Sequence, residues 1–356
     1  PVCFKITAFE RDCYGKTVAV LSRKKAQLEC QEQFLSRLRP GDIIPAGSDA
    51  QQMLGRTPDR IRAAMPLSDG VISDFDMTTA MISYFIKKVY AGNLIKPRVV
   101  ICVPSGVTEV ESNAVVSAAA SAGARKVYLI EEPVAAAIGA GIDISKPEGN
   151  FILDIGGGTS DVAVLSLSGI VCKTSVRMAG RKLDEAIVRY VRGKSGLLIG
   201  ERMAERAKIA CGSVFFTPEE DCEIEIKGRN LRTGLPGKVT VTRGELCEAL
   251  SDPIETIILA VRRILEITPP ELAADIHRNG LILTGGGALL HGLDRLLERE
   301  THLPVRVADN PTECVARGTA AAFGYLDQLA DGFSRSSTYR HSPIGPVTER
   351  SPCHEA

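Results

Sequence analysis

Residues 150–165 read NFILDIGGGTSDVAVL, and the fold follows from this stretch. Two short apolar runs, residues 151–155 and 162–165, flank Gly156, Gly157 and Gly158. Apolar runs of this length that are bounded by glycine are typical of buried strands. Because glycine has no side chain, the backbone can turn tightly there, and its N–H groups can converge on a phosphate oxygen. The pattern predicts a strand–loop–strand unit that is either a phosphate-binding loop or an ordinary glycine-rich hairpin.

Polar residues on both sides of the glycines favour the phosphate loop. Asp154 is the only charged residue in the first apolar run, and Thr159 and Ser160 follow the glycines. A carboxylate at the end of a buried strand suits a hydrated Mg²⁺ better than a core contact.

A second stretch, residues 280–290, reads GLILTGGGALL and repeats the theme. An apolar strand leads into Gly285, Gly286 and Gly287, and a helix is expected directly after them. Its apolar face would carry Leu289, Leu290, Leu293, Leu296 and Leu297. Two such units about 130 residues apart indicate two similar halves that face one ligand.

Length and composition restrict the class of protein. A chain of 356 residues suggests two or three domains. Its 43 basic and 43 acidic residues give no support to a nucleic-acid binder held by bulk charge, so we expect no nucleic-acid partner. The ten cysteines form no C-x-x-C pair, which predicts reduced thiols in a cytosolic protein. No apolar run approaches the ~20 residues of a membrane span, and the N-terminus has no signal-peptide pattern.

Strand and helix patterns alternate along most of the chain. Asp76 is expected to cap a helix, and antiparallel strands are expected near residues 222–226 and 239–242. Further strands are expected at residues 98–103, 126–130, 171–178 and 304–307, and further helices at 109–122, 183–191, 202–211 and 311–323. This order predicts an α/β protein with a cleft between two domains.

Three acidic or basic residues outside the glycine loops have two interpretations each. Glu132 precedes Pro133, so it is expected at a helix N-terminus at the end of a strand. It could orient a water for attack on a phosphate, or only complement the helix dipole. Glu205 and Lys208 share one helix face at i,i+3, where they could form a surface pair or hold a ribose.

Taken together, these stretches resemble the actin-like ATPases, and within them the bacterial MreB/Mbl family. The resemblance runs from about residue 46 to 329. It rests on several motifs that occur in order, because a single triple glycine is not specific by itself. They are MLGRTP at 53–58, DGVI at 69–72, LIEEPVAAAIGAG at 129–141, DIGGGT at 154–159 and LTGGGALL at 283–290. It implies an actin-like (ribonuclease H-like) duplicated two-domain fold with a nucleotide cleft between the domains.

The resemblance also implies domain boundaries. They are an atypical N-terminal segment 1–45, the first half of domain I at 46–149, domain II at 150–308 with a small subdomain near 182–250, a C-terminal helix at 309–330 that returns to domain I, and a disordered tail at 331–356.

Roles for individual residues follow from the same resemblance. Glu132 matches the acid that positions the attacking water, assisted by Thr159, which favours the catalytic interpretation of Glu132. ATP and Mg²⁺ are the implied cofactors, with Asp154 facing Mg²⁺ through water. The implied ATP-binding residues are Asp154, Gly156, Gly157, Gly158, Thr159, Gly180, Glu205, Lys208, Gly285, Gly286 and Gly287.

The implied function is that of a bacterial actin homologue whose ATP-dependent, membrane-associated filaments organise cell-wall synthesis and rod shape, with weak ATPase activity. Such proteins form paired protofilaments of their own copies, act with inner-membrane morphogenesis proteins, and lie in the cytoplasm against the inner face of the membrane. Leu94 and Ile95 occupy the position of a membrane-inserting loop, and a small core contact is the alternative.

The N-terminus departs from this pattern. The first phosphate loop of the family, an apolar strand followed by Asp-Leu-Gly-Thr, is not found in residues 1–45. Gly15-Lys16-Thr17 lacks the spacing of a P-loop, since Glu10 stands where that motif needs glycine. The alternative function is therefore a nucleotide-impaired actin-like structural subunit, from a fragment or frame-shifted copy. A chaperone-like or sugar-kinase ATPase is a third class, for which neither a large substrate domain nor a catalytic aspartate is identified.

Overall fold

The glycine-rich stretch forms the hairpin that the sequence predicts. Strands β7 (Asn150–Ile155) and β8 (Ser160–Ser166) pair antiparallel, which places Asp154 opposite Asp161. The computed structural model describes residues 5–11, 17–22, 53, 56–57, 63, 65–89, 96–322 and 333–335. Within this part, the hairpin lies in a five-stranded sheet of order β14-β13-β7-β8-β9. The other three strands are β9 (Gly169–Val176), β13 (Leu281–Thr284) and β14 (Val305–Val307).

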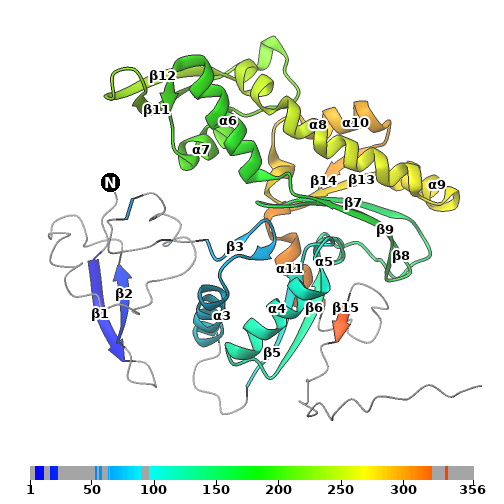
Figure 1. Cartoon of the computed structure of the whole chain (residues 1–356). Coiled ribbons are helices and arrows are strands. Elements are labelled where there is room, and N and C mark those ends of the chain that lie inside the picture. The colour runs from blue at the N-terminus through cyan, green and yellow to red at the C-terminus, as the bar shows by residue number, and fades with distance from the viewer. Residues whose placement is uncertain are drawn as a thin grey trace, which may run out of the picture.

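Helices cover both faces of this sheet (Figure 1). Successive residues of β7 point to opposite faces, as the two-residue period of a strand requires. Phe151 and Leu153 join the core beneath the first group of helices, whereas Ile152 joins the core on the other face. The first group comprises α6 (Gly180–Ser195), α7 (Glu201–Cys211), α8 (Arg243–Ile267), α9 (Pro270–Asn279) and α10 (Leu293–Thr301). The second group is α5 (Glu132–Gly139) and α11 (Cys314–Ala321).

A second sheet lies beyond α5 and α11. Strands β5 (Arg98–Val103) and β6 (Lys126–Glu131) are parallel, as expected for strands joined by a crossover helix, here α4 (Glu109–Ser121). The third strand, β15 (Phe333–Arg335), pairs antiparallel with β6. Residues 333–335 thus form a strand where a disordered tail was expected; the rest of that tail lies outside the described residues.

Two small units complete the described part of the chain. The hairpin β3 (Leu67–Ser68) and β4 (Val71–Ile72) leads into α3 (Phe75–Val89). Asp74, not Asp76, caps this helix, since its Oδ1 accepts the Met77 N–H at 3.0 Å. Far above it in Figure 1, β10 (Leu197–Leu198), β11 (Glu223–Asn230) and β12 (Pro236–Thr242) form a three-stranded sheet beside α6 and α7.

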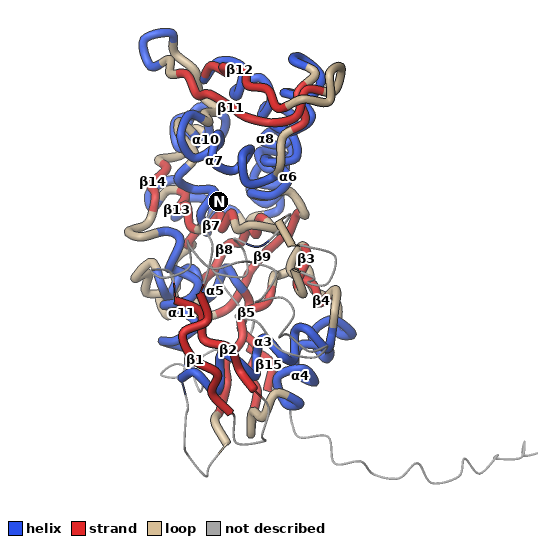
Figure 2. Tube along the Cα trace, turned by 90° about the vertical axis from the view of Figure 1, so that its left-hand side faces the viewer, coloured by secondary structure: helices blue, strands red, loops and turns tan. Residues whose placement is uncertain are grey.

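The N-terminal residues form a separate hairpin of β1 (Lys5–Arg11) and β2 (Thr17–Ser22). It makes a two-stranded sheet of its own and is not hydrogen-bonded to the sheet of β5 and β6. Neither strand was expected from the sequence pattern. Figure 2 shows them along one side of the molecule.

Helices α5 and α11 cross with their backbones in contact. A Cβ atom at Gly318 would overlap the carbonyl oxygen of Ala135, and one at Gly139 would overlap the carbonyl oxygen of Cys314. Glycine is therefore required at both positions, which brings α11 against the helix that carries Glu132.

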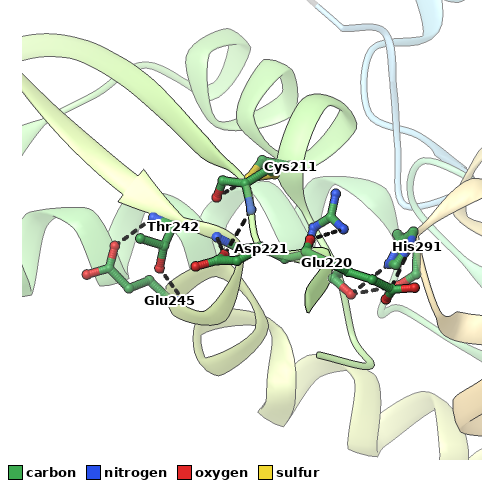
Figure 3. The surroundings of a disulfide bond; sticks show 9 residues. Cys211, Glu220, Asp221, Thr242, Glu245 and His291 are labelled. Atoms are coloured by element: carbon green, nitrogen blue, oxygen red, sulfur yellow. Dashed lines mark hydrogen bonds and ion pairs between the residues drawn. A yellow bond between two sulfur atoms is a disulfide. The ribbon is translucent and has the colours of Figure 1, made fainter. Parts of the chain in front are cut away.

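A disulfide joins Cys211, the last residue of α7, to Cys222, just before β11 (Figure 3). The expectation of reduced thiols is wrong for this pair. In the described part of the chain, Cys102, Cys172, Cys247 and Cys314 are free. Ser213 lies in the segment that the disulfide closes. Its Oγ is 3.1 Å from the His291 Nδ1.

Two further observations bear on the membrane. Among the helices that the structure describes, none combines the length and apolar character needed to cross a bilayer. Leu94 and Ile95, the expected membrane loop, lie outside the described residues.

Candidate functional site

The loop at Gly156–Gly158 is a tight turn fixed by its own backbone. The Gly156 N–H donates to the Thr159 carbonyl at 3.0 Å. The start of α6 closes on the same loop, because the Gly180 N–H donates to the Gly156 carbonyl at 3.1 Å. A Cβ atom at Gly157 would meet nothing within 4 Å, so this residue borders open space. The loop thus presents backbone to open space, as a phosphate cradle requires.

Asp154 is buried between Thr284 and Asp161, the residues opposite it on the two neighbouring strands. Thr284 faces it from β13 and donates its hydroxyl to the Asp154 Oδ1 at 2.7 Å. Asp161 faces it from β8. Burial raises the pKa of Asp154 to about 6, although the Thr284 hydrogen bond opposes the rise. The two glycine-rich units therefore meet at this carboxylate as neighbouring strands of one sheet. The expectation that they mark two halves facing one ligand is wrong.

Glu132 brings a third carboxyl group to the same place. It is the first residue of α5, directly after β6, as the sequence predicts. Burial, then the charges of Asp161 and Asp154, raise its pKa to about 8, and a hydrogen bond with Thr159 opposes the rise. The structure thus brings Glu132, Thr159 and Asp154 together at one site.

Asp161 is held by polar neighbours at this site. The Ser105 N–H donates to the Asp161 Oδ1 at 2.7 Å, and the side chains of Ser175, Ser105 and Thr159 also hydrogen-bond its carboxyl group. Burial also raises the pKa of Asp161. In the described part of the chain, no three histidine, cysteine or acidic side chains are placed to hold a metal ion together. The carboxylates of this corner therefore suit a hydrated divalent cation that they reach through water.

Helices α6 and α7 form one wall of the cleft near Gly180. The Lys208 Nζ donates to the Gly180 carbonyl and pairs with the Asp184 carboxylate, both at 2.8 Å. Lys208 therefore pairs with Asp184 on α6 and not with Glu205. Burial raises the pKa of Asp184 to about 6, and the hydrogen bond and charge of Lys208 oppose the rise. The charges of Glu205 and Glu201 add smaller increases.

Gly285, Gly286 and Gly287 lie against the end of β7. A Cβ atom at Gly285 or Gly287 would overlap Ile155, so close packing of the two strands already requires glycine there. A 3₁₀ turn (Gly286–Leu289) follows in place of the expected continuous helix, and Leu289 is exposed. Helix α10 begins only at Leu293.

Four residues of this site were not singled out from the sequence: Asp161, Thr284, Ser105 and Asp184. The signal for Asp161 and Thr284 is the register of β7 with its two neighbours, which a single sequence does not reveal. Ser105 and Asp184 are brought in by tertiary packing of segments far apart in the chain.

Comparisons with known proteins agree with this architecture. The family model described as "MreB/Mbl protein" matches residues 35–331. The cell shape-determining protein MreB of Escherichia coli (strain K12) is 51% identical over 290 residues, covering 81% of this chain and 83% of that protein. The cell shape-determining protein Mbl of Bacillus subtilis (strain 168) is 48% identical, with 81% and 87% covered.

Solved structures share the fold. MreB5 of Spiroplasma citri bound to ADP is 36% identical with a TM-score of 0.76, covering 80% of this chain and 86% of that one. A MamK double helical filament, 22% identical with a TM-score of 0.65, covers 79% and 85% and shares the fold alone.

Fold and comparisons together define the class: this is an actin-like protein, as the sequence predicted. Within that class, the chain belongs to the MreB/Mbl family of cell-shape proteins.

Proposed function

We propose that this chain binds ATP with Mg²⁺ in the cleft between its two α/β halves and hydrolyses it slowly. The observation that carries the proposal is the convergence of three buried carboxyl groups, those of Glu132, Asp154 and Asp161, on the glycine loop. The related structures of Spiroplasma citri MreB5 are bound to ADP and AMPPNP, which supports nucleotide binding here.

Each residue of the cleft has a task in this proposal. The backbone at Gly156, Gly157 and Gly158 holds the phosphates, and Asp154 orients water around Mg²⁺, which neutralises phosphate charge when bound. Glu132 accepts a proton from the attacking water, and the Thr159 hydroxyl orients that water. On the adenosine side, Lys208 and Glu205 hold the ribose near Gly180, and residues 285–287 lie beneath the base.

We further propose that nucleotide drives assembly into paired protofilaments that act in cell-shape control at the inner face of the cell membrane. The names of the curated relatives support the cell-shape role. Membrane contact through Leu94 and Ile95, and partnership with inner-membrane morphogenesis proteins, rest on the family resemblance.

Sedimentation of the full chain tests assembly. With Mg²⁺ and ATP we expect polymer in the pellet, and with ADP less of it. The Glu132→Gln variant should pellet with ATP at least as well, because hydrolysis is slowed while binding is kept. A pellet that does not depend on nucleotide would contradict ATP-driven assembly.

One observation favours a second candidate, a structural subunit impaired in nucleotide binding. The family's first phosphate loop is not found in residues 1–45, and β1 and β2 form a sheet apart from β5 and β6. This candidate predicts assembly that is equal with and without ATP.

A further inference from the structure

The β3–β4 hairpin rests on the tip of the glycine loop. Asp69 and Gly70 form its turn, with φ angles of 51° and 78°. A Cβ atom at Gly158 would lie 2.8 Å from the Asp69 Cα, and one at Gly70 would lie 3.4 Å from the Thr159 Cγ2. The turn of this hairpin therefore touches the phosphate loop directly, from a segment about 90 residues away in the sequence.

Arg181 lies at the same contact, held by its own backbone. Its N–H, in the first turn of α6, donates to the Gly157 carbonyl at 2.9 Å. Its guanidinium Nη2 lies 3.0 Å from the Asp69 Oδ1, and a Cβ atom at Gly158 would lie 2.7 Å from that nitrogen. One cation thus bridges the loop tip and the hairpin turn.

The charges around the loop leave this guanidinium as the group suited to a phosphate. Glu132, Asp154 and Asp161 make the floor acidic. Two nearby lysines already have carboxylate partners: Lys208 pairs with Asp184, and Lys173 pairs with Glu131 at 2.6 Å. Arg181 also has a carboxylate partner, Asp69, and its Nη1 lies 3.5 Å from the Met65 Sδ. What distinguishes it is its place at Gly158, the loop tip, where both side chains of the ion pair are about 30% exposed (29% and 31%).

We propose that Arg181 binds the terminal phosphate of a nucleoside triphosphate held by the 156–159 loop. Asp69 and that phosphate compete for the Arg181 guanidinium, which gives up Asp69 when it binds the phosphate. The inference rests on the nucleotide-binding function proposed above. A guanidinium presents two parallel N–H donors, which suit a phosphate as well as a carboxylate. A triphosphate places its last phosphate at the loop tip, whereas a diphosphate leaves the Asp69–Arg181 pair intact.

In this proposal the Asp69–Arg181 ion pair distinguishes a bound triphosphate from a bound diphosphate. With triphosphate bound, Arg181 turns from Asp69 to the ligand, and the β3–β4 turn loses its ionic contact. With diphosphate bound, that contact returns. The nucleotide state is thereby transmitted to the hairpin and to α3, which begins three residues after Ile72.

Calorimetric titration of the full chain with ADP and with AMPPNP, each with Mg²⁺, tests the inference. We expect Arg181→Ala to weaken AMPPNP binding about tenfold, as for loss of one charge-assisted contact, and to change ADP binding by less than about twofold. Asp69→Asn should bind AMPPNP at least as tightly as the unchanged chain. The control is Lys182→Ala, because Lys182 pairs with Glu185 on its own helix and should affect neither ligand.

Each other result has a stated meaning. Equal losses for both nucleotides, no loss for either, or an Asp69→Asn variant as weak as Arg181→Ala would overturn the inference alone. Should the unchanged chain bind neither nucleotide, the proposed function fails and the inference with it. If thermal melting shows that Arg181→Ala is unfolded, Arg181→Lys replaces it, and the same selective loss is expected because lysine lacks the bidentate fork.

Discussion

Three carboxyl groups share one buried corner of this molecule, and burial makes their ionised forms unfavourable. Glu132, Asp154 and Asp161 have raised pKa values, chiefly because burial disfavours the charged form. Perturbed acids of this kind cluster at functional sites. Asp154 was identified from its place before the glycines, whereas Asp161 and Thr284 required the strand register. Arg181 and Asp69 were missed because their contact joins distant segments.

Replacing Glu132 by glutamine should separate hydrolysis from binding. The amide keeps the shape of the side chain but cannot accept a proton from water. We expect ATP turnover to fall by about 10²-fold or more, as for loss of a general base, while nucleotide affinity stays within a few-fold. Phosphate release and calorimetry measure the two quantities. Unchanged turnover would remove Glu132 from the reaction.

The same acid should make stability depend on pH. The pKa of Glu132 is about 8 in the folded chain, against 4.5 as the ordinary value, so between these values the folded state binds the proton more tightly. The free energy of unfolding should therefore fall as pH rises through this window and level off above it. Glu132→Gln should be more stable than the unchanged chain by roughly 2–4 kcal/mol at pH 8, with little difference near pH 4.5.

Urea unfolding over a pH series measures this dependence. Saturating Mg²⁺-nucleotide should flatten the slope, since a bound cation favours the ionised carboxylates. A free energy of unfolding that rises between pH 5 and 8 in the absence of nucleotide, by an amount that Glu132→Gln does not alter, would show that this acid is not destabilised by burial.

At the scale of elements, local pattern was a good guide wherever the chain alternates regularly. The strand expected at residues 98–103 is β5, and the one expected at 126–130 is β6 with one more residue. The sequence pattern was a poor guide to segments whose conformation depends on contacts with distant parts of the chain. Strand β15 exists through pairing with β6, and the segment after Gly285–Gly287 is a short turn because it packs on β7.

The crossing of α5 and α11 should tolerate no side chain at Gly318. An alanine there would overlap the Ala135 carbonyl, so the two helices must separate. We expect Gly318→Ala to lower the free energy of unfolding by about 2–4 kcal/mol. The control is Gly193→Ala in α6, where a Cβ meets nothing within 4 Å; it should raise stability by up to about 1 kcal/mol. Equal effects from the two changes would refute the close crossing.

The disulfide should stabilise the wall that carries Lys208. It joins two cysteines, Cys211 and Cys222, that are 11 positions apart in the sequence. In the chain-entropy account, a loop of this length contributes about 2–3 kcal/mol. The Cys211→Ser/Cys222→Ser double variant should therefore unfold at lower denaturant concentration, and dithiothreitol should lower the stability of the unchanged chain but not of the variant. If reductant affects both alike, the pair is not bonded in solution.

For the whole molecule, the two-domain actin-like fold was predictable because five motifs occur in a fixed order between residues 53 and 290. What the sequence could not provide is how the halves meet. The contacts that join them include single pairs of distant residues, such as Ser105 with Asp161 and Asp69 with Arg181. The N-terminal strands β1 and β2 have no counterpart in the predicted pattern, and the family match begins only at residue 35.

Nucleotide binding is the central claim, and calorimetric titration of the full chain with ATP and Mg²⁺ tests it most directly. The matched control is Gly157→Asp, because a Cβ at Gly157 meets nothing within 4 Å and the added carboxylate would only repel phosphate. We predict saturable binding with a dissociation constant on the order of micromolar, weakened at least about tenfold by Gly157→Asp. A folded chain that shows no saturable binding, or binds equally well with the added carboxylate, would contradict this account of the site.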